Sequence, residues 1–137
     1  MTTNTTPQQR IINPWTWQDQ LGYSQAIEVS GGQHVLYCAG QASMDADGKP
    51  AHPGDMRAQL TQALDNLETV LTQAGYTLAN VVRLNYYTTD VDALFQNWDV
   101  LLTRLAQAGI RPGGTLVGVT RLAFPDLLVE IEATAVR

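Results

Sequence analysis

Hydrophobic residues recur at helical spacing in two segments of the chain, which predicts two amphipathic helices. The first segment follows Asp55, which favours a helix N-cap, and reaches Gly75, where glycine favours a helix end. Its apolar residues share one helix face: Met56, Leu60, Ala63, Leu64, Leu67, Val70 and Leu71. The second segment begins near Asp90 or Asp92 and ends around Gly109. It would bury Leu94, Phe95, Trp98, Leu101, Leu102 and Leu105.

Shorter apolar runs between turn-forming residues predict five strands outside these helices. Residues 23–29 and 34–40 are separated by Ser-Gly-Gly and predict a β-hairpin. The other strands are expected at 81–89, 115–122 and 127–136. The order ββαβαββ lets both helices lie on one sheet face, which predicts an α+β fold with the opposite face open. An open sheet face on a small domain indicates a homo-oligomer.

The chain of 137 residues has the length of one domain. Residues 1–12 are polar and lack periodicity, so we expect a flexible segment there and a single domain over 13–137. The first residues have neither the basic nor the apolar region of a secretion signal. No stretch approaches the ~18 apolar residues of a membrane span. We therefore expect a cytoplasmic protein without a membrane partner.

Charge and composition exclude several chemistries. Thirteen acidic and eight basic residues give a net charge of −5, which repels phosphate backbones and predicts no nucleic acid partner. Lys49 is the only lysine, so pyridoxal chemistry has almost no candidate for a Schiff base. Cys38 is the only cysteine, and with His34 and His52 it forms no metal-ligand spacing. We expect no cofactor and no metal.

Three features could carry chemistry, and each has a structural alternative. Glu130 and Glu132 share one face of the last strand; they are either its solvated side or, under another subunit, carboxylates that activate water. Tyr23 leads a strand and could seal the core or line a cleft. The loop 111–115 could cradle an anion or simply connect two elements, since it lacks the spacing of nucleotide-binding loops.

A set of motifs from Gly22 onward resembles the Rid (YjgF-like) family. The motifs are GYSQA (22–26), AGQ (39–41), DADG (45–48), QALDNL (62–67), AG (74–75), VVR (81–83), DVD (90–92), VGVTRL (117–122) and VEIEA (129–133). The best-known members hydrolyse reactive enamine and imine intermediates released by pyridoxal enzymes. The resemblance implies a chorismate-mutase-like homotrimer that binds small molecules in clefts between its subunits.

The resemblance also assigns roles to single residues. Glu130 matches the family glutamate that positions the attacking water, and Tyr23 matches a cleft tyrosine. Gly114 stands where deaminating members carry the arginine that binds the substrate carboxylate. Ala39 stands in place of a cleft serine, and Leu116 in place of a frequent cysteine. These replacements make the expected pocket less polar than that of an amino-acid imine deaminase.

The remaining pocket residues are expected to be Gly40, Trp98 and Thr115, and Arg111 or Arg83 could substitute for the missing arginine. Glu130 would be the acid–base residue of a Rid-like enzyme for an enamine, imine or related unsaturated metabolite, with ordinary 2-iminoacid deamination not expected. The alternative is a non-catalytic trimer of the same fold that binds a metabolite or stabilises a protein.

Overall fold

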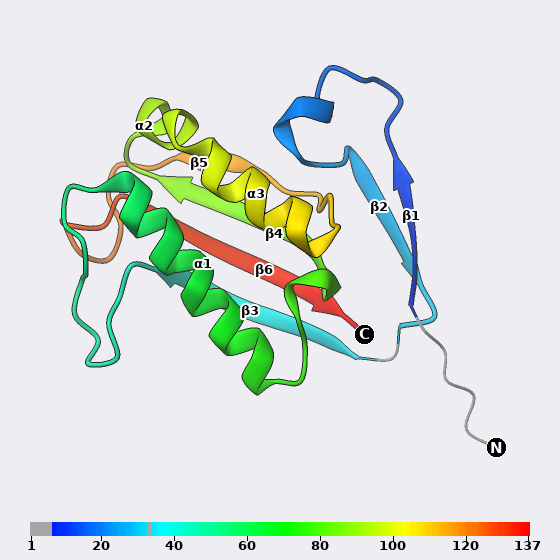
Figure 1. The fold of residues 1–137 in the computed structure, drawn as a ribbon, viewed down its shortest axis with the longest axis horizontal. Coiled ribbons are helices and arrows are strands. Elements are labelled where there is room, and N and C mark those ends of the chain that lie inside the picture. Colours follow the sequence, from blue (N-terminus) through cyan, green and yellow to red (C-terminus); the bar gives the residue numbers. More distant parts are fainter. Residues whose placement is uncertain (1–6, 33) are drawn as a thin grey trace.

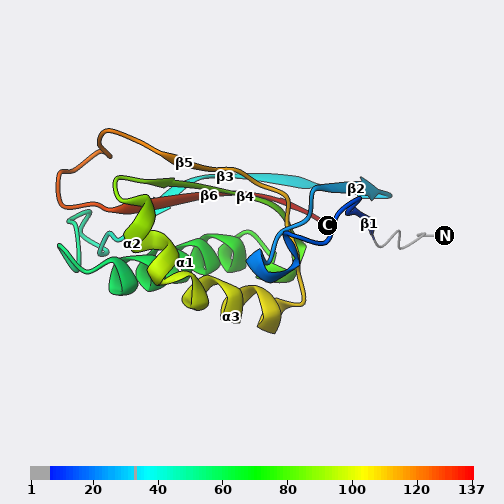
Figure 2. The same ribbon diagram turned by 90° about the horizontal axis from the view of Figure 1, so that it is seen from above.

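A four-stranded mixed sheet with helices on one face forms most of the structure, a computed structural model that describes residues 7–32 and 34–137 (Figure 1). In spatial order its strands are β3 (Val35–Ala42), β6 (Val129–Val136), β4 (Val81–Thr88) and β5 (Leu116–Gly118). β4 and β5 are parallel, whereas β6 is antiparallel to both of its neighbours. The helices are α1 (Met56–Gln73), α2 (Val91–Gln96) and α3 (Trp98–Ala108), and Figure 2 shows them on the same side of the sheet. The predicted α+β class with its helices on one face is confirmed.

The core lies between the helices and the sheet. Alternate residues of β6 point toward the helices and are buried: Val129, Ile131, Ala133 and Ala135. On α1 the facing leucines are at most 1% exposed: Leu60, Leu64, Leu67 and Leu71. Burying each such leucine stabilises the fold by roughly 1.5–3 kcal/mol. Glu130 and Glu132 fall between the buried positions of β6 and share its other face, as predicted.

The first predicted helix is confirmed, and the second is divided. The carboxylate of Asp55 accepts a hydrogen bond from the Ala58 amide at 3.0 Å and caps α1. The second segment breaks at Asn97 into α2 and α3, so the prediction of one continuous helix was wrong. The side-chain amide of Asn97 donates to the Ala93 carbonyl at 2.8 Å, a local bond that competes with regular helix geometry. Gly109 ends α3 with φ 69°, as its residue type predicts.

The predicted β-hairpin was wrong in its pairing. β2 (Ala26–Ser30) pairs with β1 (Gln8–Ile12) in a separate two-stranded sheet, and β3 pairs with β6. β1 falls within residues 1–12, which we expected to be flexible; residues 1–6 lie outside the described part. Its sequence gives no strand signal because most of it is exposed and neither of its faces needs apolar residues. Arg10 instead pairs with Glu28 across the two strands at 3.1 Å.

Two short 3-10 helices complete the fold, η1 (Asp19–Leu21) and η2 (Leu78–Asn80).

The strand expected at 115–122 is shorter than predicted. β5 pairs with β4 only as far as Thr88, where the Val119 amide donates a last hydrogen bond to the Thr88 carbonyl at 2.8 Å. Within residues 7–32 and 34–137, no helix has the length and apolarity needed to cross a bilayer.

Candidate functional site

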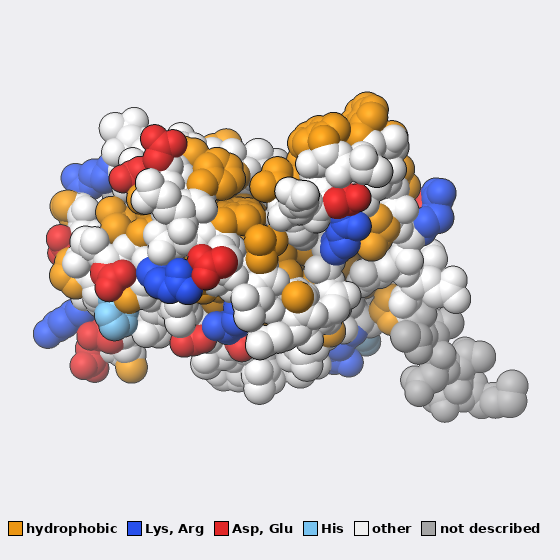
Figure 3. All heavy atoms as spheres, turned by 45° about the horizontal axis from the view of Figure 1, so that its top comes forward, with side chains coloured by type: hydrophobic (Ala, Val, Ile, Leu, Met, Phe, Trp, Pro, Cys, Tyr) orange, Lys and Arg blue, Asp and Glu red, His pale blue; other side chains and the backbone are white. Residues whose placement is uncertain are grey.

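A pocket of about 360 Å³ opens between α3, the β5 edge of the sheet and the segment that precedes β2. Figure 3 shows apolar side chains gathered in a hollow between the helices and the loop that joins β1 to β2. The pocket is lined by Leu21, Gly22, Tyr23, Gln25, Leu84, Tyr86, Phe95, Trp98, Leu105, Gly114, Thr115 and Leu116. A concave and mainly apolar site with a few polar groups is typical of small-molecule binding.

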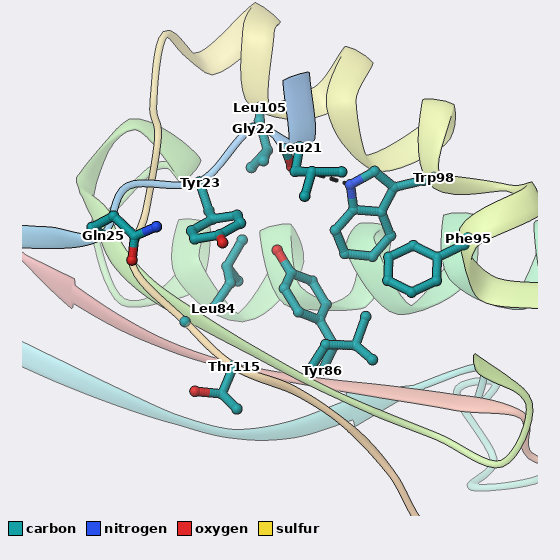
Figure 4. A pocket seen from close by; sticks show the side chains of 12 residues that line it. Leu21, Gly22, Tyr23, Gln25, Leu84, Tyr86, Phe95, Trp98, Leu105 and Thr115 are labelled. Atoms are coloured by element: carbon teal, nitrogen blue, oxygen red, sulfur yellow. Dashed lines mark hydrogen bonds between the residues drawn. The ribbon is translucent and has the colours of Figure 1, made fainter. Parts of the chain in front are cut away.

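Aromatic side chains form one wall and the floor of this pocket (Figure 4). The Trp98 ring lies edge-on to Tyr86, with 5.1 Å between ring centroids, and it contacts Phe95 at 5.6 Å. The Trp98 indole N–H donates to the Leu21 carbonyl at 3.1 Å and so ties α3 to the opposite wall. Burial raises the pKa of the Tyr86 phenol well above its usual range, which keeps it neutral.

The segment that carries Tyr23 is held in place from outside the pocket. Gly22 has φ 82°, and a Cβ there would lie 2.6 Å from the Leu102 side chain, so this close approach to α3 favours glycine. The Ser24 hydroxyl donates to the Arg111 carbonyl, and the Arg111 guanidinium donates to the Asp19 carboxylate at 2.8 Å. The same guanidinium donates to the Tyr23 carbonyl at 3.3 Å. Arg111 therefore supports the pocket wall and is not among the residues that line it.

Gly114 occupies a position with no room for a side chain. A Cβ there would lie 1.7 Å from the Leu84 carbonyl oxygen, because the chain runs directly against β4. The Leu84 amide donates to the Gly113 carbonyl at 2.9 Å, and the Tyr86 amide donates to the Thr115 carbonyl at 2.8 Å. With this backbone path an arginine cannot be accommodated at position 114.

The predicted acid–base residue lies on the opposite side of the sheet. We call this side the open face; it carries Tyr37, Asn85, Tyr87, Glu130 and Glu132. The Glu130 side chain packs over Gly40, where a Cβ would lie 2.7 Å from its carboxyl carbon. Gly40 and Ala39 form the irregularity at which the register between β3 and β6 shifts. The structure thus brings Glu130, Gly40 and Ala39 together.

A hydrogen-bonded group of side chains lies beside Glu130 on the open face. Asn85 donates to Glu132 at 3.0 Å, and the Tyr87 hydroxyl donates to the same carboxylate oxygen. The Tyr87 and Asn85 hydrogen bonds lower the pKa of Glu132. Asn85 also accepts from the Thr115 amide at 3.1 Å, so it links this group to the edge of the pocket. Among the residues that the structure describes, no group of three His, Cys, Asp or Glu side chains could hold a metal ion.

The expected site residues therefore fall into two sets on opposite sides of the sheet. Tyr23, Trp98 and residues 114–116 line the pocket, whereas Glu130 with residues 39–40 lies on the open face. The sequence reasoning missed Tyr86 as a pocket residue, although the alternation of β4 already placed it with Leu84.

Known proteins are similar to this chain over most of its length. The family model described as Endoribonuclease L-PSP matches residues 18–137. A RutC family protein of Pyrococcus horikoshii is 33% identical over 113 residues, which are 82% of this chain and 85% of the relative. The chain belongs to the Rid (YjgF/RutC) family. The RutC family protein YjgH of Escherichia coli is 32% identical over 111 residues, 81% of each chain.

A solved Rid family structure has the same fold over nearly the whole chain. The Rid protein YyfB of Yersinia pestis is 36% identical, with a TM-score of 0.84 over 94% of this chain and 98% of that chain. The chorismate-mutase-like α+β fold implied by the sequence motifs is thereby confirmed. The match reaches beyond the motifs that begin at Gly22 and takes in most of the N-terminal part.

Proposed function

We propose that this Rid family protein is a homotrimeric enzyme that adds water to a small imine, enamine or related unsaturated metabolite in a cleft between subunits. The observation that carries the proposal is the division of the site between the two faces of the sheet. One protomer offers an aromatic pocket on the helix side, and a carboxylate, Glu130, on the open face. A neighbouring protomer seated on the open face brings its own pocket to this carboxylate.

Glu130 has the chemistry that such a hydration step requires. A carboxylate accepts a proton from water while the water oxygen bonds to the imine carbon. The same proton is then returned to the substrate nitrogen, which gives a carbinolamine. Glu130 next accepts the proton of the new hydroxyl and passes it to the nitrogen while the carbon–nitrogen bond breaks, and a carbonyl compound and an amine leave. Gly40 supports this role because its missing side chain leaves the space in which the Glu130 carboxylate lies.

The pocket favours apolar or aromatic substrates over the imines of short amino acids. Gly114 cannot carry an arginine, and Arg111 is paired with Asp19 outside the pocket. A charge-assisted bond to a carboxylate contributes about 1.5–3 kcal/mol, so its absence lowers affinity by roughly one to two orders of magnitude. Ordinary 2-iminoacids are therefore poor substrates in this proposal.

The absence of a carboxylate-binding arginine at position 114 also motivates a second candidate function. This candidate is a non-catalytic trimer that binds a metabolite or stabilises a protein. Such a protein would bind ligands in the same pocket without turning them over.

The ribonuclease activity in the family model's description fits this chain less well, since its net charge of −5 and single lysine give little attraction for phosphates.

The proposal is tested by turnover of a panel of imines with the Glu130→Gln variant. The panel contains 2-iminobutanoate, released by a pyridoxal-dependent dehydratase, and neutral imines of aromatic aldehydes. We expect the wild type to accelerate hydrolysis of the neutral imines, and Glu130→Gln to lower the rate about 100-fold or more.

Glu132→Gln is the matched control, because it lies on the same strand and face but its carboxylate is already held by Tyr87 and Asn85. It should retain most of the turnover. Full activity in Glu130→Gln would contradict the role of this carboxylate. Binding of the imines without any acceleration by the wild type would favour the non-catalytic candidate.

A further inference from the structure

One polar group inside the pocket has no explanation in the fold itself. Tyr86 is 7% exposed, and Figure 4 shows its side chain rising from β4 with the hydroxyl directed into the pocket. No described residue forms a hydrogen bond with this hydroxyl. Within the described residues, every completely enclosed side-chain nitrogen or oxygen has a hydrogen-bond partner. Because the Tyr86 hydroxyl has none, it is not completely enclosed and is accessible from the pocket.

Packing alone does not account for a phenol at this depth. A phenylalanine ring would make the same edge contact with Trp98 without bringing a hydroxyl into an apolar pocket. No hydrogen bond joins this hydroxyl to the other polar side chains that line the pocket, Tyr23, Gln25 and Thr115. The hydroxyl is therefore available to a molecule that fills the pocket.

The other lining groups define the charge of that occupant. Among the lining residues there is no Asp, Glu, Lys or Arg; the polar ones are Tyr23, Gln25, Tyr86 and Thr115. An anionic ligand would lose its hydration here without gaining a counter-charge. The rings of Phe95 and Trp98, whose planes are tilted by 57°, instead favour an aromatic ring that stacks on one of them or packs edge-on.

We propose that Tyr86 determines the specificity of this pocket by donating a hydrogen bond to the imine nitrogen or carbonyl oxygen of a neutral aromatic molecule. The inference rests on the proposed function, because it takes the pocket as the ligand site. It narrows the substrate class to neutral aromatic imines, whose hydrolysis yields aromatic carbonyl compounds. Because burial keeps the phenol protonated, it can donate to the substrate and to the product alike.

The test compares three ligands, and it compares the wild type with a variant that lacks one polar atom. Acetophenone carries the carbonyl acceptor, ethylbenzene has nearly the same shape without it, and benzoate adds a charge. Binding is followed through the NMR signal of the Trp98 indole N–H, which lies in the pocket wall. We expect Tyr86→Phe to weaken acetophenone binding about 3- to 10-fold and to leave ethylbenzene binding unchanged within about 2-fold.

Tyr76→Phe is the matched control, since it removes the same hydroxyl from a side chain that is likewise 7% exposed but does not line the pocket. It should change neither affinity. Equal binding of acetophenone by the wild type and Tyr86→Phe would overturn the role of Tyr86 and leave the proposed function intact. Benzoate binding more tightly than acetophenone would overturn the neutral ligand class. If none of the three compounds shifts the Trp98 signal, the pocket is not the ligand site and both proposals fail.

Discussion

Tyr86 and Tyr87 are neighbours on β4, yet they belong to different surfaces of the molecule. Tyr86 points toward the helices, where burial alone raises the pKa of its phenol. Tyr87 points to the open face, where its hydrogen bond to Glu132 is the main cause of a raised pKa. The two side chains have the same chemistry, and the alternation of one strand gives them an apolar pocket on one side and a carboxylate group on the other.

This difference shows how a thin sheet can serve two parts of one site. In the proposed function, residues of the helix side bind the apolar body of a ligand, and residues of the open face supply proton acceptors. Because the sheet separates the two sets, a single protomer cannot apply both to one molecule. The proposed trimer resolves this by placing the pocket of one protomer beside the Glu130 of the next.

The largest expected effect on stability comes from adding a side chain at Gly114, where the edge of the pocket lies against β4. In Gly114→Ala the new Cβ would lie 1.7 Å from the Leu84 carbonyl oxygen, so the chain must move away from β4 and lose its backbone hydrogen bonds there. We expect a loss of at least about 3 kcal/mol in the free energy of unfolding, measured by urea denaturation.

Gly113→Ala is a close control for this variant. A Cβ at Gly113 would have its nearest neighbours at 3.9 Å, the carbonyl oxygens of Ser24 and Val82, which is ordinary contact. Its free energy of unfolding should stay within about 1 kcal/mol of the wild type. Equal stability of the two variants would show that the chain can move away from β4 at little cost. Position 114 could then accommodate an arginine side chain.

The next effect concerns assembly through the open face. Tyr37 is 80% exposed there, and Tyr37→Glu would place a charge in the interface that the proposed trimer requires. Burying that charge without a partner should raise the dissociation constant about 100-fold or more, measured by sedimentation velocity. Val70→Glu, on the exposed side of α1, should leave assembly unchanged. A wild-type protein that is monomeric at all concentrations would contradict the trimer.

The sequence was sufficient to predict the helices and strands that bury one face and expose the other. Helix α1 and strand β6 carry clear apolar periods, and the structure confirms both. β1 could not be predicted, because its exposed polar residues are fixed by pairing with β2 and not by burial. The division at Asn97 depends on one side-chain hydrogen bond to the backbone, which composition does not reveal.

The candidate site was predictable only in part, for a similar reason. The family motifs pointed to Tyr23 and Glu130, and Trp98 was expected beside them as a further pocket residue. The alternation of β4 and β6 fixed the side of the sheet on which each strand residue lies. The exclusion of side chains at Gly114 depends on how closely two segments approach each other. Distances between segments far apart in the chain are a property of the packed fold, so a glycine in a loop gave no sign of them.

The smallest expected effect is a shift in one titration on the open face. The hydrogen bond from Tyr87 is the first cause of the lowered pKa of Glu132, followed by the one from Asn85. Tyr87→Phe removes the first donor, so the pKa of Glu132 should rise toward its ordinary value, as measured by NMR of the side-chain carboxyl carbon. Tyr37→Phe, on the same face, should leave this titration unchanged.

Tyr87→Phe should also change how the free energy of unfolding depends on pH, in a direction that follows from the lowered pKa of Glu132. A carboxyl whose pKa is lower in the folded state stabilises the protein above the pKa of the unfolded chain, about 4.3 for glutamate, and this stabilisation is lost as the pH falls through the folded value. Wild type and Tyr87→Phe should therefore differ in free energy of unfolding at neutral pH and converge in acid. A difference that stays constant from pH 7 to pH 3 would mean that Tyr87 contributes through packing and not through the Glu132 carboxylate.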